Sequence, residues 1–250
     1  MPKAPMTQKE IEIIRGRILD TALNIIIEEG YKNLSVRKIA ARLGVTATTI
    51  YNYYTGKDEL NLMIRVRGFE KLHDMLTQAA AGQDTIEAQL DAMIRAYVRF
   101  GLTWQGYYDL MFNLDTPKYL DYVGTEIEST AAYEKKTALK CLHLFSDPIR
   151  ASLTGEGPAL QQKPKSEPKS DPPPEAEQFI LNKVVMFWSD LHGLITLSNS
   201  RLFHEVLDSV EAFIEARITD LVDNFLMLKA RVDAGEPLQG TTGSGAQNEK

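Results

Sequence analysis

The chain has 250 residues, of which 44% are apolar and 25% are charged, and its formal net charge is −6. This length allows one large domain or two small ones with a sizeable core. The single cysteine, Cys141, excludes an internal disulfide, and the start of the chain lacks the apolar run of a signal peptide, so we expect a cytoplasmic protein. No stretch reaches the ~20 apolar residues that a membrane span requires.

The charge is distributed unevenly along the chain. Residues 1–70 contain eleven Lys and Arg against eight Asp and Glu, a net charge of +3, whereas residues 71–250 contain seventeen against twenty-six, a net charge of −9. A basic N-terminal part in front of an acidic remainder would orient the protein on a phosphate backbone. Most of the individual acidic charges also fit a plain solvated surface.

The N-terminal residues predict one long amphipathic helix. Thr7-x-x-Glu10 is a capping box, an apolar stripe runs through residues 11–25, and Gly30 follows the expected C-terminus. We therefore expect a helix over residues 8–29.

The next stretch, residues 34–54, predicts a helix, a short turn and a second helix. Ser35 can cap the first helix and Thr46 the second, while Gly44 between them accepts the positive φ of a helix end. Ile50 is the one strongly apolar inward position of the second helix, which leaves a face of small polar and aromatic groups. This is the arrangement of a helix-turn-helix, in which the second helix enters the major groove of DNA.

An ordered set of short motifs runs through this region: Gly30-Tyr31, Ser35 to Ala40, Leu43-Gly44-Val45, Thr49-Ile50-Tyr51 and Lys57 to Leu60. On these motifs, about the first quarter of the chain resembles the TetR family of bacterial transcriptional regulators. The resemblance implies an all-α fold of about nine helices, with a three-helix helix-turn-helix head at residues 1–55 and a ligand-binding and dimerisation domain at residues 56–232.

Two further helices are expected at the start of the body. Thr55-x-x-Asp58 is a second capping box and opens a helix that continues to about Ala80. Asp84 can cap the next helix, and an aromatic-rich segment follows at residues 100–112.

The second half of the body contains one interruption. Pro117 in a first helical turn predicts a helix from there to about residue 145. A stretch near residues 152–174 is rich in Pro, Lys, Ser and Glu, and we expect a disordered loop there, as well as a disordered tail at residues 233–250.

Two long apolar helices are expected near residues 175–197 and 202–229. Both have apolar stripes that are wide for surface helices, as expected if part of each packs on a second copy of the chain. The family resemblance implies the same homodimer.

Eleven residues of the helix-turn-helix region are candidates for DNA contacts. Thr and Ala methyl groups can touch a thymine methyl, Asn can pair with adenine, and Arg37 can reach a guanine or a phosphate. Lys57 and the free amides at the start of its helix form a candidate anion site, whereas Tyr51 has the alternative of packing between helices. The candidates are Ser35, Val36, Arg37, Thr46, Ala47, Thr48, Thr49, Tyr51, Asn52, Tyr53 and Lys57.

The resemblance also implies a small-molecule site in the body, whose occupancy moves the two heads apart. Aromatic walls with a few polar groups suit an apolar or aromatic effector. Core packing is the alternative for each of these side chains, because burial is the usual fate of aromatic residues. The candidates are Trp104, Tyr107, Tyr108, Met111, Phe112, Trp188 and His192, the last two within a Trp-x-x-x-His-Gly pattern that some TetR-like regulators share.

Catalytic chemistry has little support in the sequence. The four histidines show no metal-ligand spacing, and neither a Gly-rich phosphate loop nor a nucleophile elbow is present. We expect no catalytic residues, no metal site and no cofactor.

Together these features predict a repressor of the bacterial cytoplasm that lies on the nucleoid when bound to DNA. It would bind a palindromic double-stranded operator as a homodimer and be released by a small effector. Two alternatives stay open. One is a ligand-independent or architectural DNA-binding protein, and the other is an enzyme or carrier that uses the helical body as a hydrophobic cavity.

Overall fold

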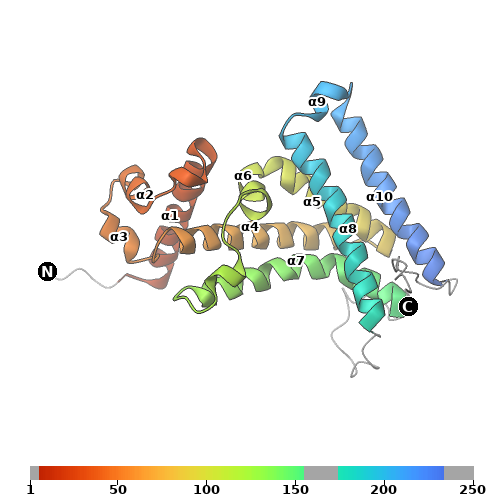
Figure 1. Cartoon of the computed structure of the whole chain (residues 1–250), viewed down its shortest axis with the longest axis horizontal. Helices are drawn as coiled ribbons and strands as arrows, with labels where there is room; N and C mark the ends of the chain where they lie inside the picture. Colours follow the sequence, from red (N-terminus) through yellow and green to blue (C-terminus); the bar gives the residue numbers. More distant parts are fainter. Residues whose placement is uncertain (1–5, 155–173, 234–250) are drawn as a thin grey trace, which may run out of the picture. The chain divides into compact units, whose positions relative to one another are not determined.

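The computed structural model describes residues 6–154 and 174–233, and these residues form helices and turns without any strand (Figure 1). The predicted all-α fold is therefore confirmed. None of the helices in these two ranges combines the length and the apolar character that a membrane crossing needs.

The chain divides into two compact units that do not follow its order. The first unit consists of Met1–Asp74 and Thr103–Lys140, and the second consists of Met75–Leu102 and Cys141–Lys250. The predicted boundary between a head and a body at residues 55 and 56 stays a prediction.

The first unit begins with three helices that gather around the N-terminal part of a fourth (Figure 1). Thr7 caps the first of them as predicted, because its Oγ1 accepts the backbone N–H of Glu10 (3.3 Å) and its own N–H donates to the Glu10 carboxylate (2.8 Å). The four helices are α1 (Gln8–Glu29), α2 (Val36–Leu43), α3 (Ala47–Tyr51) and α4 (Lys57–Ala80).

Local signals set the corner between α2 and α3. Ser35 Oγ accepts the Lys38 backbone N–H, and Thr46 Oγ1 accepts the Thr49 backbone N–H, each at 3.2 Å. Gly44 lies in the left-handed region at φ 67°, where a side chain would strain the backbone. The three predicted roles are confirmed.

Two predicted caps are displaced by one residue. Because α4 begins at Lys57, its third residue is Glu59, and the Glu59 carboxylate accepts the Thr55 N–H (2.6 Å) and hydroxyl (3.0 Å) in place of Asp58. The helix α5 (Ile86–Thr103) is capped by Thr85, whose Oγ1 accepts the Ala88 N–H at 3.1 Å, and not by Asp84.

The remainder of the first unit is less regular than expected. A short helix, α6 (Gln105–Tyr108), continues into a π-helical turn at Asp109–Asn113, and a 3₁₀ helix follows at Tyr119–Tyr122. The helix predicted from Pro117 to about residue 145 is present, but both of its predicted ends are wrong, since α7 spans Glu128–Thr154. Its start is delayed because Gly124 has a φ of 80°, which interrupts any helix that passes through it.

The second unit contains most of α5 together with three later helices. The helix predicted near residues 202–229 is in fact two helices, because Leu207 is extended (φ −123°, ψ 137°) and Ser209 Oγ caps a new start by accepting the Ala212 N–H at 3.2 Å. The later helices are α8 (Pro174–Asn199), α9 (Phe203–Val206) and α10 (Val210–Asp233).

One glycine fixes the packing of α5 on α8. A Cβ at Gly101 would lie 2.5 Å from Ile195 Cγ2, and Ile195 is completely buried. Asn199 Nδ2 also donates to the Gly101 carbonyl at 3.0 Å. The two helices therefore approach more closely here than any larger residue would allow.

Two predicted disordered segments lie largely outside the described residues. Residues 152–154 end α7 and Pro174 begins α8, while residues 155–173 are not described. The tail at residues 234–250 is likewise not described, so disorder in both segments stays a prediction.

Candidate nucleic-acid interface

The inner side of the helix-turn-helix is held by buried aliphatic residues. Ile39 on α2 and Ile50 on α3 are both 0% exposed, and Ala40 is also buried. Because their side chains fill the core, the opposite face of the short helix α3 is left toward solvent.

Arg15 ties the end of α3 to α1. Its Nη1 donates to the Tyr53 carbonyl at 2.9 Å, and its guanidinium lies 4.4 Å from the centre of the Tyr54 ring. The Tyr54 hydroxyl donates back to the Arg15 carbonyl at 3.3 Å. Burial raises the pKa of Tyr54, so this phenol stays neutral and able to donate.

The predicted DNA-contact residues form a largely accessible surface. Val36 is the exception: its side chain is buried in the core, so only its backbone amide, unpaired within α2, is left to meet DNA. The hydroxyls of Ser35 and Thr46 are engaged as caps, although both residues are exposed. Arg37, Thr48, Tyr51 and Asn52 are also exposed, and Ala47, Thr49, Tyr53 and Lys57 are half-buried.

The cations of α2 differ in their availability. Lys38 forms an ion pair with Glu29, and Arg42 Nη2 lies 2.6 Å from Glu28 and 2.7 Å from Glu29. The hydrogen bond from Lys38 lowers the pKa of Glu29. Arg37 has no hydrogen-bond or ion-pair partner among the residues that the structure describes, and it is the cation of α2 most available to a phosphate.

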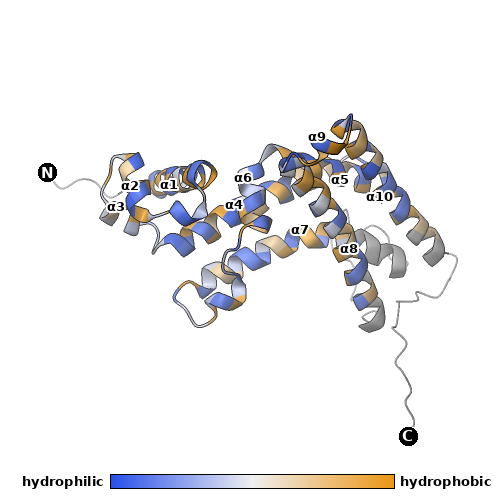
Figure 2. Cartoon of the chain, turned by 45° about the horizontal axis from the view of Figure 1, so that its top comes forward, coloured by the Kyte–Doolittle hydropathy of each residue, from blue (hydrophilic) through white to orange (hydrophobic). Residues whose placement is uncertain are grey.

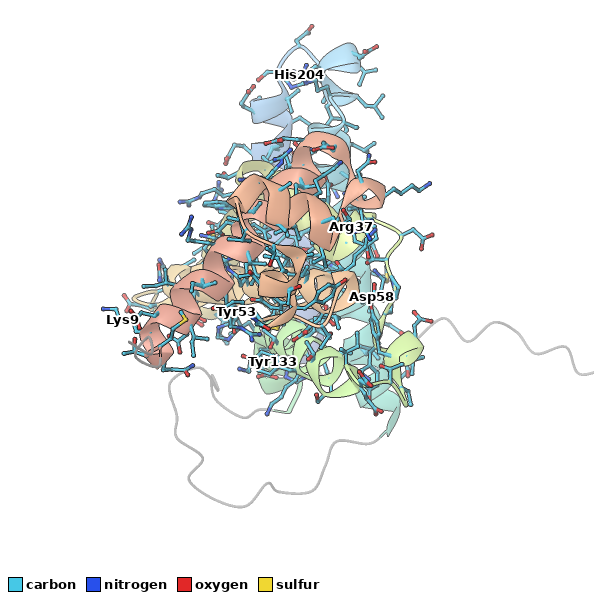
Figure 3. All side chains as sticks on the ribbon, turned by 90° about the vertical axis from the view of Figure 1, so that its left-hand side faces the viewer. Lys9, Arg37, Tyr53, Asp58, Tyr133 and His204 are labelled. Atoms are coloured by element: carbon cyan, nitrogen blue, oxygen red, sulfur yellow. The ribbon has the colours of Figure 1, made fainter. Side chains whose placement is uncertain are left out.

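Figure 3 places two cations on different sides of this unit. Lys9, near the start of α1, lies on one side of this view and Arg37, on α2, lies on the other, with Tyr53 between them and Asp58 on the side of Arg37.

The Lys57 ammonium group already has contacts within the protein. Its Nζ donates to the Tyr31 carbonyl at 2.9 Å and lies 4.0 Å from the centre of the Tyr31 ring. At the start of the same helix, the Glu59 carboxylate accepts a hydrogen bond from the Thr55 N–H. An anion at this end of α4 would thus share the site with internal partners, although Lys57 still has N–H donors to offer.

The predicted effector residues lie in two different units. Tyr107, Tyr108 and Met111 are buried in the first unit, where Phe112 packs against Phe69 with ring centroids 5.7 Å apart. Trp104 is 40% exposed, with Lys71 Nζ over its ring at 3.9 Å.

Trp188 and His192 belong to the second unit. Trp188 Nε1 donates to the Tyr97 hydroxyl at 2.8 Å, and the Trp188 and His192 rings are 6.2 Å apart. Burial lowers the pKa of His192, which favours the neutral imidazole. The predicted effector residues are thus divided between the two units, and their role in effector binding stays a prediction.

Two glycines bring the aromatic segment against neighbouring helices of the first unit. A Cβ at Gly106 would lie 2.5 Å from Ile27 on α1, and a Cβ at Gly68 on α4 would lie 2.5 Å from the Met111 sulfur and 3.1 Å from Tyr107. Sequence reasoning missed both contacts, because a glycine within a helical pattern does not reveal what approaches it.

A buried polar group on α4 was also missed. Asn61 and Arg65 are almost fully buried and face Glu134 of α7 and Tyr122. Their spacing of four residues within an apolar stripe was the available signal. Among the described residues, no group of three or more His, Cys, Asp or Glu side chains could hold a metal ion.

Two family models and several bacterial regulators match this chain. Residues 18–62 match a model of bacterial regulatory proteins of the tetR family, and residues 90–221 match a tetracyclin repressor-like C-terminal domain. The uncharacterized HTH-type transcriptional regulator Rv0681 of Mycobacterium tuberculosis is 24% identical over 225 residues, which are 88% of this chain and 85% of the relative. The HTH-type transcriptional repressor KstR of Mycolicibacterium smegmatis is 32% identical over 80 residues, or 32% of this chain and 39% of the relative.

Solved structures share the fold. A bacterial regulatory protein of the tetR family from Rhodococcus RHA1 superposes with a TM-score of 0.57 at 14% identity, over 84% of this chain and 95% of that one. The fatty acid degradation regulator FadR from Bacillus halodurans gives a TM-score of 0.54 at 15% identity, over 87% of this chain and 96% of that one.

Proposed function

This chain belongs to the tetR family of bacterial regulatory proteins, and from that premise we propose that it is a repressor released from DNA by a small effector. It is a transcriptional regulator of the helix-turn-helix type, as its relatives are. Repression is supported by the name of one relative, the transcriptional repressor KstR. Such a protein acts on the nucleoid, in the cytoplasm.

The exposed face of α3 carries the proposal for DNA recognition. With Ile50 turned into the core, Thr48, Tyr51 and Asn52 point outward, where a methyl group can contact thymine and an amide can pair with adenine. Arg37 would reach a guanine or a phosphate. Contacts with phosphates, which fix the register, would come from Ser35, Tyr51, Tyr53 and Lys57. The groove-facing surface would be completed by Thr46, Ala47 and Thr49.

Homodimerisation is supported by apolar side chains on α8 and α10. Figure 2 shows hydrophobic residues alternating with hydrophilic ones along both helices. Exposed Ala212 and Ala216 on α10 would let another helix approach closely. The exposed large apolar residues are Leu181, Val185, Met186, Trp188 and Leu197 on α8 and Met227 on α10. A second copy that covered them would form a four-helix bundle and place two recognition helices on a palindromic operator.

Release by an apolar or aromatic effector would act through the aromatic segment, residues 104–112. Its π-helical turn is a feature often found at functional sites. The contacts of Gly106 with Ile27 and of Gly68 with Met111 join this segment directly to α1 and α4. An effector that binds one arrangement of these helices more tightly than another would shift the position of α3, and only that difference in affinity can do so.

A ligand-independent DNA-binding protein is the second candidate. Tyr108 and Leu110 are completely buried and Phe112 stacks within the same core, as expected of an aromatic segment that only stabilises the fold. In that case no small molecule would change operator affinity.

Selection of bound sequences from a random duplex DNA pool, at near-physiological salt, tests the proposal. We expect an inverted repeat whose half-sites lie about one helical turn apart. Recovery of only salt-sensitive, sequence-blind binding would contradict a dimeric operator-specific repressor. Screening small apolar and aromatic compounds against the recovered operator then separates the two candidates.

Arg37→Ala tests the proposed DNA-binding surface itself. Removal of one phosphate interaction per protomer should lower affinity for every DNA sequence and reduce the salt slope by about 1 for each phosphate that is no longer neutralised. Lys136→Ala removes an exposed cation of α7 in the same unit and serves as the matched control. An unchanged slope in the Arg37 variant would remove this residue from the interface.

A further inference from the structure

One cation of the first unit is held by an aromatic ring and not by a carboxylate. The ammonium of Lys57, the first residue of α4, lies 4.0 Å from the centre of the Tyr31 ring. Its Nζ also donates to the Tyr31 carbonyl at 2.9 Å. Among the residues that the structure describes, Lys57 forms no ion pair with a carboxylate, the neighbouring Asp58 included. Tyr31 is therefore the main partner of this side chain.

Tyr31 has a fixed position in the turn that links α1 to α2. It begins the 3₁₀ helix Tyr31–Asn33, and its carbonyl also accepts the Leu34 N–H at 3.1 Å. Both lone pairs of this carbonyl are thus in use, one by the turn and the other by Lys57. Because the Tyr31 side chain is half-buried as well, neither the ring nor the carbonyl can follow a moving lysine.

The ring orients the ammonium without cancelling its charge. Burial raises the pKa of Tyr31, with Asp58 adding to the rise and Arg65 opposing it, so the phenol is neutral at physiological pH. A neutral ring attracts a cation through its quadrupole, and the positive charge stays available to an outside anion. Lys57 can therefore be ordered and charged at the same time.

Lysine and arginine of α2 are held in a different way. The Glu29 carboxylate pairs with both Lys38 and Arg42, and a phosphate would have to displace it before binding either. Lys57 has three N–H donors, of which the Tyr31 carbonyl takes one, so donors are left for a phosphate. A mobile lysine loses rotamer freedom when it binds, and a ring that already holds the ammonium removes part of that cost.

We propose that Tyr31 is a positioning residue for DNA binding, which holds the charged Lys57 ammonium where the phosphate backbone meets the N-terminus of α4. The inference rests on the phosphate contact proposed above for Lys57. It gives a role in DNA binding to the 3₁₀ helix between α1 and α2, none of whose residues is a predicted DNA contact.

A double-mutant cycle on DNA affinity tests the proposal with the full chain. Duplex DNA of random sequence is a sufficient probe, because phosphate contacts do not depend on sequence. Tyr31→Leu removes the ring but keeps the carbonyl, and should lower affinity by roughly 3- to 10-fold for each bound protomer, while Tyr31→Phe should keep the parental affinity. In a Lys57→Met background, Tyr31→Leu should change nothing further, because the cation that the ring holds is gone.

The salt dependence separates the two residues. Lys57→Met should reduce the salt slope by about 1 for each phosphate that is no longer neutralised, whereas Tyr31→Leu should keep the slope, since the charge is still present. Tyr119→Leu is the matched control. Lys135 Nζ lies over the Tyr119 ring at 4.6 Å in the same unit, and neither residue is a predicted DNA contact, so affinity should stay unchanged.

Ring-current shifts in NMR spectra test the contact itself without DNA. The Hε protons of Lys57 should lie upfield of their ordinary position in the parent protein and in Tyr31→Phe, and should return to it in Tyr31→Leu. Lys57→Met identifies the signal. Unshifted protons in the parent protein would overturn the proposal even if Tyr31→Leu failed to fold.

The remaining failures differ in what they overturn. An equal loss of affinity from Tyr31→Leu with and without Lys57, or a loss that Tyr31→Phe shares, would make Tyr31 a packing residue. An unchanged salt slope in Lys57→Met would remove the phosphate contact on which the positioning role depends. Each of these results overturns the role of Tyr31 and leaves the proposed function standing. A parent protein that bound no duplex DNA would overturn both.

Discussion

Two groups of ion pairs in the first unit join helices in opposite surroundings. The exposed group links α1 to α2 through Glu29, Lys38 and Arg42, with side chains about one-third exposed. The buried pair links α4 to α7 through Arg65 and Glu134, whose side chains are 6% and 4% exposed. The contact distances are nearly the same, 2.7 Å for Arg42 with Glu29 and 2.6 Å for Arg65 with Glu134.

The difference between these groups lies in what replaces a missing partner. At the surface, water and salt solvate a cation whose carboxylate has been removed, so little stability depends on the pair. In the core no solvent reaches the orphaned charge, and its desolvation is no longer offset. Distance alone therefore does not rank ion pairs, and the exposure of the side chains does.

Glu134→Gln should give the largest effect. This substitution keeps the shape of the side chain but leaves Arg65 buried without a counter-charge, and we expect a loss of about 3–5 kcal/mol in the free energy of unfolding. Urea denaturation at one fixed protein concentration would measure it, with Glu29→Gln as the exposed counterpart. If both variants lost the same stability, the contrast between the two groups would be wrong.

Arg65→Met combined with Glu134→Leu should have a smaller effect of the opposite sign. Removing both charges abolishes the desolvation cost together with the attraction, so stability should stay unchanged or rise by about 1–4 kcal/mol. The single variant Arg65→Met, which strands the carboxylate, is the control and should be destabilised. A double variant less stable than either single one would show that the pair itself stabilises the fold.

The pH dependence of the exposed group should be the smallest effect. Lys38 and Arg42 lower the pKa of Glu29 below its ordinary value of 4.5. A carboxyl with a lowered folded pKa contributes stability that is fully present above pH 4.5 and is lost as pH falls through the folded pKa. In acid denaturation curves, the difference in unfolding free energy between Glu29→Gln and the parent protein should therefore disappear at low pH and in high salt. A difference that grew with acidification would contradict this sign.

Elements governed by neighbouring residues could be predicted from the sequence. Thr7, Ser35 and Thr46 act as caps on residues three positions away, and Gly44 needs only its own backbone freedom. The same local reasoning failed where two candidate caps adjoin. Asp84 and Thr85 are both good caps, and it is Thr85 that accepts the Ala88 N–H.

The candidate interface was predicted in outline but not in its electrostatics. The accessible face of α3 follows from one inward residue, Ile50, and a helical period. The pairing of Lys38 and Arg42 with Glu29 spans nine and thirteen positions and depends on how α1 meets α2. The net charge of residues 1–70 therefore does not reveal which cations are left for a phosphate.

By itself, the sequence determined the all-helical class, the caps of the first three helices and the family resemblance, because these depend on residues close together in the chain. The tertiary structure decided that the Val36 side chain lies in the core and that Lys57 donates to the Tyr31 carbonyl. It also decided that Ile27 packs against Gly106. It also brought Asn61 and Arg65 to Tyr122 and Glu134. The physical reason is that burial and charge pairing arise only when helices distant in sequence pack together and exclude water from the groups between them.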